Sequence, residues 1–344
     1  MSDADRQTTG SSGHGQRVAV VGAGMAGITC TRSLVRAGRS VTLIDKARGP
    51  GGRMSTRRTE HGAIDHGAQY FTARNPRFRE EVNAWIADGV VQEWHGPLAT
   101  IGSDGLMMIR GDNRRFVGVP RMSALTRHLS ASCKTLFNWR VARIERHGTD
   151  WWLHEERGAR LGPFDLVVVA VPAPQAIPLL QGAPSLAMRA RSAVLAGCYA
   201  VMLVYDERLP LPFDGAFVNR GPLSWIARNS SKPGREGAET WVLHASPDWS
   251  EAHIEEPPDQ VIPMLLAAFA EAVNAKLPQP LLAVAHRWRH ALPINLLEEP
   301  CLFDPELAIG ACGDWCGGPR VEGAYLSGAA LADLVIAHRD QPAG

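Results

Sequence analysis

Residues 17–27 restrict the possible folds of this chain more than any other segment. An apolar run over 17–21 predicts a buried parallel strand. It leads into a helix predicted over 25–37 through the glycine pattern Gly22-Ala23-Gly24-Met25-Ala26-Gly27. In such a pattern the first glycine permits a tight turn, the second lets backbone approach a diphosphate, and the third lets the helix lie close to the sheet. The helix N-terminus would then bind the phosphates of a dinucleotide.

Polar residues after the second strand, which is predicted over 41–44, extend this nucleotide site. Asp45 directly follows that strand, where a carboxylate can bind ribose hydroxyls. A glycine pair ending at Gly52 would let the backbone approach a cofactor, and the guanidinium of Arg53 offers donors to phosphate or ring oxygens. We interpret Arg57 and Arg58 as part of a solvated basic loop.

A second cofactor element lies near the other end of the chain. A strand predicted over 307–312 leads to Asp314, which could accept hydrogen bonds from ribityl hydroxyls. The segment from Glu322 leads into a closing helix predicted over 325–338, whose N-terminus could face the flavin edge that gains negative charge on reduction. A simple NAD dehydrogenase has no need of this distant element, so the sequence predicts FAD.

The predicted elements indicate an α/β fold, with a Rossmann-type FAD-binding domain and a mixed-sheet substrate domain. Because the two cofactor elements lie far apart in the sequence, we expect the FAD-binding domain to be discontinuous, with residues 17–75, 115–180 and 291–344. The substrate domain would hold 76–114 and 181–290, after a disordered tail over 1–16. Further strands are predicted over 41–44, 140–145, 151–155, 166–171, 194–206, 240–245 and 283–290, and further helices over 76–87, 122–129 and 259–275.

The composition excludes several classes of partner. The net charge is +1, which gives no general attraction to nucleic acid or to a membrane surface. No apolar run is long enough to span a membrane, and the polar N-terminus lacks the features of a signal peptide. A cytoplasmic location is therefore expected, with a small-molecule substrate and an electron acceptor as partners.

The cysteines and histidines give no clear metal site. The chain has six cysteines and no CxxC pair. Cys312 and Cys316 could form a redox pair or tether a flavin, although we favour two small apolar side chains in a tight loop. His286 and His290 would share one face of a strand, but no third ligand is spaced nearby, so no metal is predicted.

Several of these segments together resemble one protein family. The runs 46–56 (KARGPGGRMST), 65–71 (DHGAQYF) and 313–315 (GDW) are similar to bacterial renalase-like flavoproteins, relatives of the flavin amine oxidases. Residues 225–229 and 287–290 match the middle region of that family, and the resemblance covers nearly the whole chain after residue 16. It implies a fold like that of p-hydroxybenzoate hydroxylase, with noncovalent FAD.

The resemblance also implies roles for single residues. Gln69 and Tyr70 would lie near the flavin, and Val141 would offer its backbone to the adenine. The residues implied to contact FAD are Ala26, Asp45, Lys46 and Arg53. Better-defined members oxidise the 2-dihydro or 6-dihydro isomers of NAD(P) to NAD(P)⁺.

That activity fits a sequence in which we find no catalytic triad. Hydride transfer to flavin N5 depends on stacking and alignment more than on an acid or base, and oxygen or another acceptor would reoxidise the flavin. Tyr70, Trp225, Trp288 and His290 are the candidates for binding substrate, although for each of the three aromatic residues we favour a place in the core. Two alternatives stay open: a flavin amine oxidase acting on a small amine or amino acid, and a nonenzymatic flavin- or nucleotide-binding protein. The four lysines do not fit the lysine that amine oxidases often place near N5, which weakens the first alternative.

Overall fold

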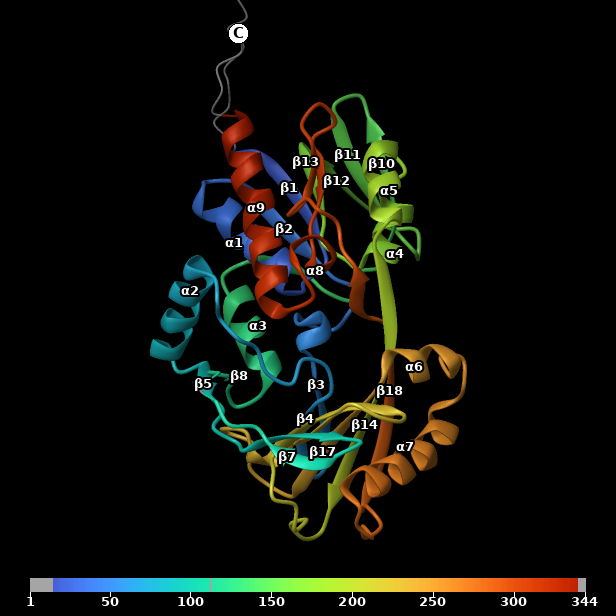
Figure 1. The fold of residues 1–344 in the computed structure, drawn as a ribbon. Helices are drawn as coiled ribbons and strands as arrows, with labels where there is room; N and C mark the ends of the chain where they lie inside the picture. Colours follow the sequence, from blue (N-terminus) through green and yellow to red (C-terminus); the bar gives the residue numbers. More distant parts are fainter. Residues whose placement is uncertain (1–14, 112, 340–344) are drawn as a thin grey trace, which may run out of the picture.

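The computed structural model describes residues 15–111 and 113–339 (Figure 1). Its upper half in Figure 1 is built on a six-stranded sheet in the order β19-β20-β13-β1-β2-β9, parallel except for β19. The parallel core confirms the predicted Rossmann-type fold. The strands are β1 (Arg17–Val21), β2 (Ser40–Ile44), β9 (Lys134–Leu136), β13 (Leu166–Val169), β19 (Leu302–Asp304) and β20 (Ile309–Ala311).

Both faces of this sheet are covered, which explains why its strands are almost wholly apolar. Alternate residues of β1 enter two different cores: Val18 and Val20 contact one, and Ala19 and Val21 the other. The first core includes α1 (Met25–Arg36) and α9 (Val321–Arg339). The second lies under β10 (Val141–His147), β11 (Asp150–Glu155), β12 (Arg160–Phe164), α4 (Ala173–Leu179) and α5 (Pro184–Arg191).

The lower half is built on a seven-stranded mixed sheet in the order β18-β14-β17-β16-β15-β6-β7 (Figure 1). Only the β15–β6 pair is parallel, so this sheet differs in kind from the first, as predicted. Its strands are β6 (Leu98–Gly102), β7 (Gly105–Met108), β14 (Val194–Tyr205), β15 (Gly215–Val218), β16 (Leu223–Arg228), β17 (Glu239–Ala245) and β18 (Leu282–Asn295).

The two faces of the seven-stranded sheet have different neighbours. Helix α7 (Pro258–Val273) packs on one face, preceded by α6 (Pro247–Ala252). A hairpin of β3 (Thr56–Thr59) and β4 (Gly62–Asp65) lies against the other face, where Ile64 contacts Met202 and Val242. The hairpin therefore lies between the two large sheets and carries residues from the predicted cofactor loop toward the substrate domain (Figure 1).

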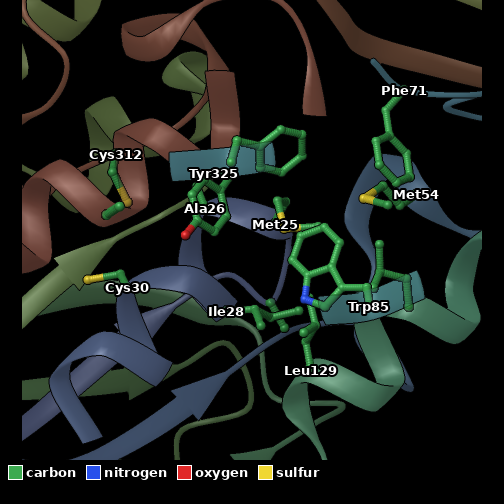
Figure 2. Packing of buried hydrophobic residues seen from close by; sticks show 14 of the residues in the cluster. Met25, Ala26, Ile28, Cys30, Met54, Phe71, Trp85, Leu129, Cys312 and Tyr325 are labelled. Atoms are coloured by element: carbon green, nitrogen blue, oxygen red, sulfur yellow. The ribbon is translucent and has the colours of Figure 1, made fainter. Parts of the chain in front are cut away.

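The remaining elements connect the sheets and helices described above. They are η1 (Gly52–Met54), α2 (Pro76–Ala87), β5 (Val91–Glu93), β8 (Phe116–Gly118), α3 (Met122–Ser130), η2 (Asn229–Ser231) and α8 (Asp314–Gly317). Figure 2 shows side chains from α1, η1, α2, α3 and α9 meeting in one apolar cluster. Among its members are Met25, Ile28, Met54, Trp85, Leu129 and Tyr325.

Some expectations about boundaries were wrong. The segment of Gly52, Arg57 and Arg58, interpreted as a loop, contains η1 and the start of β3, and the closing helix begins at Val321 rather than at 325. Gln16, assigned to the tail, is buried, and its carbonyl accepts a hydrogen bond from Ser40 N; residues 1–14 of that tail lie outside the described part. The division proposed between 290 and 291 falls inside β18, so a single strand continues from one proposed domain into the other.

Within the described ranges, no helix combines the length and apolar composition needed to cross a bilayer.

Candidate FAD-binding and substrate site

The turn from β1 into α1 leaves open space at one glycine. Gly22 has φ +110°, and a side chain there would collide with the carbonyl of Ala170. At Gly24, by contrast, an added Cβ would meet no atom within 4 Å, and no side chain caps the helix at this residue. Gly52 faces it, since a Cβ on Gly52 would lie 3.5 Å from the Cα of Gly24. Free N–H groups at the start of α1, beside the open space at Gly24, fit a diphosphate.

Asp45 is tied to the same turn. Its carboxylate accepts hydrogen bonds from Ala23 N at 2.7 Å and from Ala47 N at 2.8 Å, so it fixes the turn as well as facing the predicted ribose position. Trp139 N donates to the carbonyl of Asp45 at 3.0 Å, which brings the segment leading to Val141 alongside. Lys46 donates to Gln175 at 3.2 Å.

Arg53 binds a second predicted cofactor residue rather than standing free. Its guanidinium donates to both oxygens of Asp314, at 2.6 and 2.7 Å, and to the carbonyl of Ala291 at 3.1 Å. Most of its donor capacity is therefore used within the protein. Arg53 therefore holds Asp314, and the expected contact of its remaining donors with FAD stays a prediction.

Two other predicted cofactor residues also make contacts within the protein. Glu322, in the first turn of α9, accepts hydrogen bonds from Arg74 N and Asn75 N at 2.7 and 2.6 Å. Ala26 is buried against Gly328 of α9, where any added side chain would collide with the Ala26 backbone. The carboxylate of Glu322 therefore orders the loop before α2, and Ala26 permits close packing of α1 on α9.

Gln69 leads to a buried charged group that the sequence did not reveal. Its Oε1 accepts a hydrogen bond from Lys232 Nζ at 3.0 Å, and its Nε2 donates to the carbonyls of Asp65 and Gly67. Lys232 is only 2% exposed, and burial lowers its pKa to about 7 despite the attraction of Asp65. Arg235 donates to Asp65 at 2.5 Å, so one carboxylate faces two cations.

Aromatic side chains lie next to this charged group. The rings of Tyr70 and Trp225 are 5.5 Å apart, and Tyr70 is 6.2 Å from Trp94. Lys232 Nζ lies 5.8 Å from the centre of the Trp94 ring. Two of the predicted substrate residues, Tyr70 and Trp225, are thus in contact, and Trp94 joins them.

The third predicted aromatic residue, Trp288, lies in a group of histidines. It stacks on His66 at 5.2 Å, donates to the His66 carbonyl at 3.0 Å and lies 4.3 Å from His286. His286 and His244 flank Ala200 in one row across the seven-stranded sheet, and Trp225 is paired with His244 in the next strand. We call Trp225, Trp288, His66, His244 and His286 the histidine–tryptophan wall.

Burial keeps the imidazoles of this wall neutral. It lowers the pKa of His66 to about 3, and the pKa values of His244 and His286 to about 4. The side-chain atoms His66 Nδ1, His244 Nε2 and Trp225 Nε1 are buried and have no hydrogen-bond partner among the described residues. Unpartnered buried polar atoms are costly, and a bound ligand is one way to satisfy them.

His290 follows the candidate Trp288 by two residues in β18. After burial, the charges of Lys46 and Arg53 are the main causes that lower its pKa, which places it beside predicted cofactor residues. The cysteines follow the simpler interpretation: within the described ranges all are free, and burial raises the pKa values of the Cys312 and Cys316 thiols. No set of three or more metal-binding side chains occurs among the residues described.

Comparison with known families agrees with this geometry. Residues 20–85 match an NAD(P)-binding Rossmann-like domain, and residues 98–336 match the family described as flavin containing amine oxidoreductase. The chain belongs to the flavin-containing amine oxidoreductase family. The family is described as flavin-containing, so the match supports an FAD-dependent oxidoreductase and weakens the nonenzymatic alternative.

Individual relatives of this flavin-containing amine oxidoreductase are distant or match a short segment. Hydroxyneurosporene desaturase of Rubrivivax gelatinosus is 47% identical over 92 residues, which cover 25% of this chain and 16% of the desaturase. A candidate protoporphyrinogen oxidase from Exiguobacterium superposes with a TM-score of 0.77 at 12% identity, covering 95% of this chain and 99% of that one. Cyclohexylamine oxidase from Brevibacterium oxydans gives 0.72 at 12% identity, covering 95% and 100%. The structural similarities establish the fold.

Proposed function

We propose that this enzyme oxidises 2-dihydro or 6-dihydro isomers of NAD(P) to NAD(P)⁺, as a renalase-like member of its family. The observation that carries the proposal is electrostatic. The aromatic side chains of the site lie among neutral imidazoles and cations, and the carboxylates next to them are already paired. A flat, uncharged dihydronicotinamide ring suits such surroundings better than an ammonium group does.

Asp65 is the carboxylate that a cationic substrate would need, and it is fully engaged. It accepts hydrogen bonds from Thr56 Oγ1 at 2.6 Å, Met122 N at 3.0 Å and Arg235 at 2.5 Å. Asp214, the carboxylate next to Trp94, is paired with Arg228 at 2.9 Å. An ammonium ion entering here would meet Lys232 without a free counter-charge.

The wall offers surfaces that stack and hydrogen bond. A neutral ring could lie along Trp288 or Tyr70, and its carboxamide could satisfy the unpartnered nitrogen atoms of His66 and Trp225. The ring would stack on an aromatic side chain, and the carboxamide would hydrogen bond to these nitrogen atoms. Neither interaction needs a proton transfer to the protein. Alignment of the ring is therefore the main contribution of these residues.

The residues that would hold FAD follow from the geometry. The open space at Gly24 fits the diphosphate, the end of β2 at Asp45 fits the adenine ribose, and Asp314, oriented by Arg53, fits the ribityl chain. When bound, FAD supplies the group that accepts a hydride. Glu322 contributes by fixing the loop before α2 at the start of α9.

Oxidation of a small amine is the second candidate, and one observation favours it. Lys232 is buried and donates to Gln69, a residue expected near the flavin, so it is the lysine that could take the role that amine oxidases give to a lysine near N5. A lysine in that position, with the rings of Tyr70, Trp94 and Trp225 around it, is compatible with an amine oxidase.

Anaerobic mixing tests the choice. The FAD-loaded enzyme is mixed separately with dihydronicotinamide isomers and with a panel of amines and amino acids, and the flavin absorbance is followed by stopped flow. We expect rapid bleaching by the 2-dihydro or 6-dihydro isomers and slow or no bleaching by amines. Rapid bleaching by an amine, with none by the isomers, would select the second candidate.

A further inference from the structure

Arg57 is half-buried in β3 yet has no counter-charge. Its side chain makes no hydrogen bond or ion pair with the described residues, and its Nε atom is buried without a partner. The other arginines near the site are neutralised: Arg53 by Asp314 and Arg235 by Asp65. This finding corrects the interpretation of Arg57 as a solvated loop residue; its neighbour Arg58 is exposed, as expected.

The register of the β3–β4 hairpin shows which way Arg57 faces. It pairs with Ile64, and paired residues of an antiparallel hairpin point to the same face. Ile64 contacts Met202 and Val242 of the seven-stranded sheet, so the Arg57 side chain also lies on the side of that sheet. Arg58 points to the opposite face, because successive residues of a strand alternate.

The neighbours of Arg57 on this side belong to the histidine–tryptophan wall. After burial, the charge of Arg57 is one of the causes that lower the pKa values of His66 and His286. These imidazoles are neutral at physiological pH, so each can donate one hydrogen bond without adding charge. One guanidinium without a counter-ion, flanked by two neutral imidazoles, is a receptor for an anion.

We propose that Arg57, with His286 beside it, is the subsite for a phosphate group of the dinucleotide substrate. The proposal rests on the proposed function and adds how the enzyme would select a nucleotide over a free nicotinamide. A phosphate lies beyond the ribose, away from the ring that reacts. An anion receptor next to the stacking surface of Trp288, rather than within it, therefore suits a nucleotide.

Direct binding tests this subsite without using turnover. FAD-saturated enzyme is titrated calorimetrically with NAD⁺, with ADP-ribose (which has the diphosphate but no nicotinamide) and with nicotinamide riboside (which has the ring but no phosphate). The variants are Arg57→Gln and Arg57→Lys, with Arg58→Gln as the matched control on the other face of the same strand. Flavin content and thermal unfolding confirm that each variant is folded and loaded.

We expect Arg57→Gln to weaken binding of NAD⁺ and ADP-ribose by ~10- to 100-fold and to leave nicotinamide riboside unchanged, since one charge-assisted contact is lost. Arg57→Lys should retain most of the affinity, and Arg58→Gln should match the wild type. Equal binding of ADP-ribose by the wild type and Arg57→Gln would overturn the proposal, as would an equal loss in Arg58→Gln. An Arg57 dependence seen for amino acid carboxylates but not for ADP-ribose would also overturn it.

The proposed function can fail separately from this subsite. If dihydronicotinamide isomers do not bleach the flavin but ADP-ribose binding depends on Arg57, the subsite stands and the activity is wrong. If the isomers bleach the flavin and the affinity for ADP-ribose does not depend on Arg57, the proposed activity stands and the proposed subsite is wrong.

Discussion

The guanidinium of Arg53 is held by the carboxylate of Asp314, at 2.6 and 2.7 Å, across 261 residues of sequence. This pair joins the glycine loop after β2 to the start of α8. Arg53 is 29% exposed at its side chain and Asp314 only 9%, so the pair is better shielded from solvent than an ordinary surface ion pair. The link is one of the contacts that shape the predicted cofactor site.

A double-mutant cycle should show strong coupling within this pair. We expect Asp314→Asn to lower the free energy of unfolding by ~1–3 kcal/mol, because Arg53 would lose its counter-charge. Arg53→Ala should also weaken FAD retention, measured as flavin per protein after gel filtration. The exposed Arg77–Asp333 pair, with an N–O distance of 2.6 Å, is the control, and its coupling free energy should be about 0.5 kcal/mol. Full flavin occupancy in Arg53→Ala would contradict the positioning role.

Replacing Gly24 by alanine should separate folding from cofactor binding. An added Cβ there meets no protein atom, so the thermal unfolding of the apoprotein should be unchanged. The same methyl group would occupy space assigned to the diphosphate, and we expect at least ~10-fold weaker FAD binding from that steric conflict. Gly49→Ala, also free of contacts, is the control and should bind FAD normally. Normal FAD affinity in Gly24→Ala would show that the diphosphate does not bind at this position.

Lys232 should make stability depend on pH on the alkaline side. Its pKa is lowered by burial from 10.5 to about 7, so between these values the unfolded chain binds more protons than the folded one. Stability therefore rises with pH across this window, by at most ~1.4 kcal/mol per pH unit. Urea unfolding at several pH values should show this rise in the wild type and not in Lys232→Met. Lys276→Met, at an exposed lysine, is the control and should show the wild-type rise. An unchanged pH profile in Lys232→Met would contradict the lowered pKa of Lys232.

The buried histidines should make the protein sensitive to acid. Burial lowers the pKa of His286 from 6.5 to about 4, so the folded state binds fewer protons between these values. Acidification from pH 6.5 to 4 therefore favours unfolding. On this acidification we expect the free energy of unfolding to fall by ~2 kcal/mol less in His286→Gln than in the wild type. This figure is reduced from the full pKa shift because His286 is partly exposed. Denaturant titrations at pH 7 and pH 4.5 measure the difference, and equal losses in both proteins would refute the assignment. His147→Gln, at the exposed end of β10, is the control.

Local sequence signals predicted the parts of the fold that are built locally. The glycine pattern from Gly22 to Gly27 specifies a turn between neighbouring elements, and β1 and α1 lie where the apolar spacing placed them. The second sheet and its helix α7 were also predicted from periodicity. These signals need only short-range regularity, which one sequence contains.

The charged part of the site could not be found in this way. Lys232 lies in a polar segment, Asn229–Ser231 and the residues after it, that is typical of a solvated loop. Its burial depends on Gln69 and Asp65, which are far away in the sequence. Arg57 was misjudged for the same reason: the face of β3 that it occupies is set by pairing with β4 and by the sheet beyond.

The contact of Gly328 with Ala26 has a consequence for how the enzyme is made. Helix α1 is synthesised long before α9, so α1 has no final partner until α9 has left the ribosome. Asp314 lies in the same late part of the chain, so the residues predicted to bind the flavin come together only after most of the described chain has been made. We expect a chain stopped shortly before residue 314 not to retain FAD, because it would lack both Asp314 and α9.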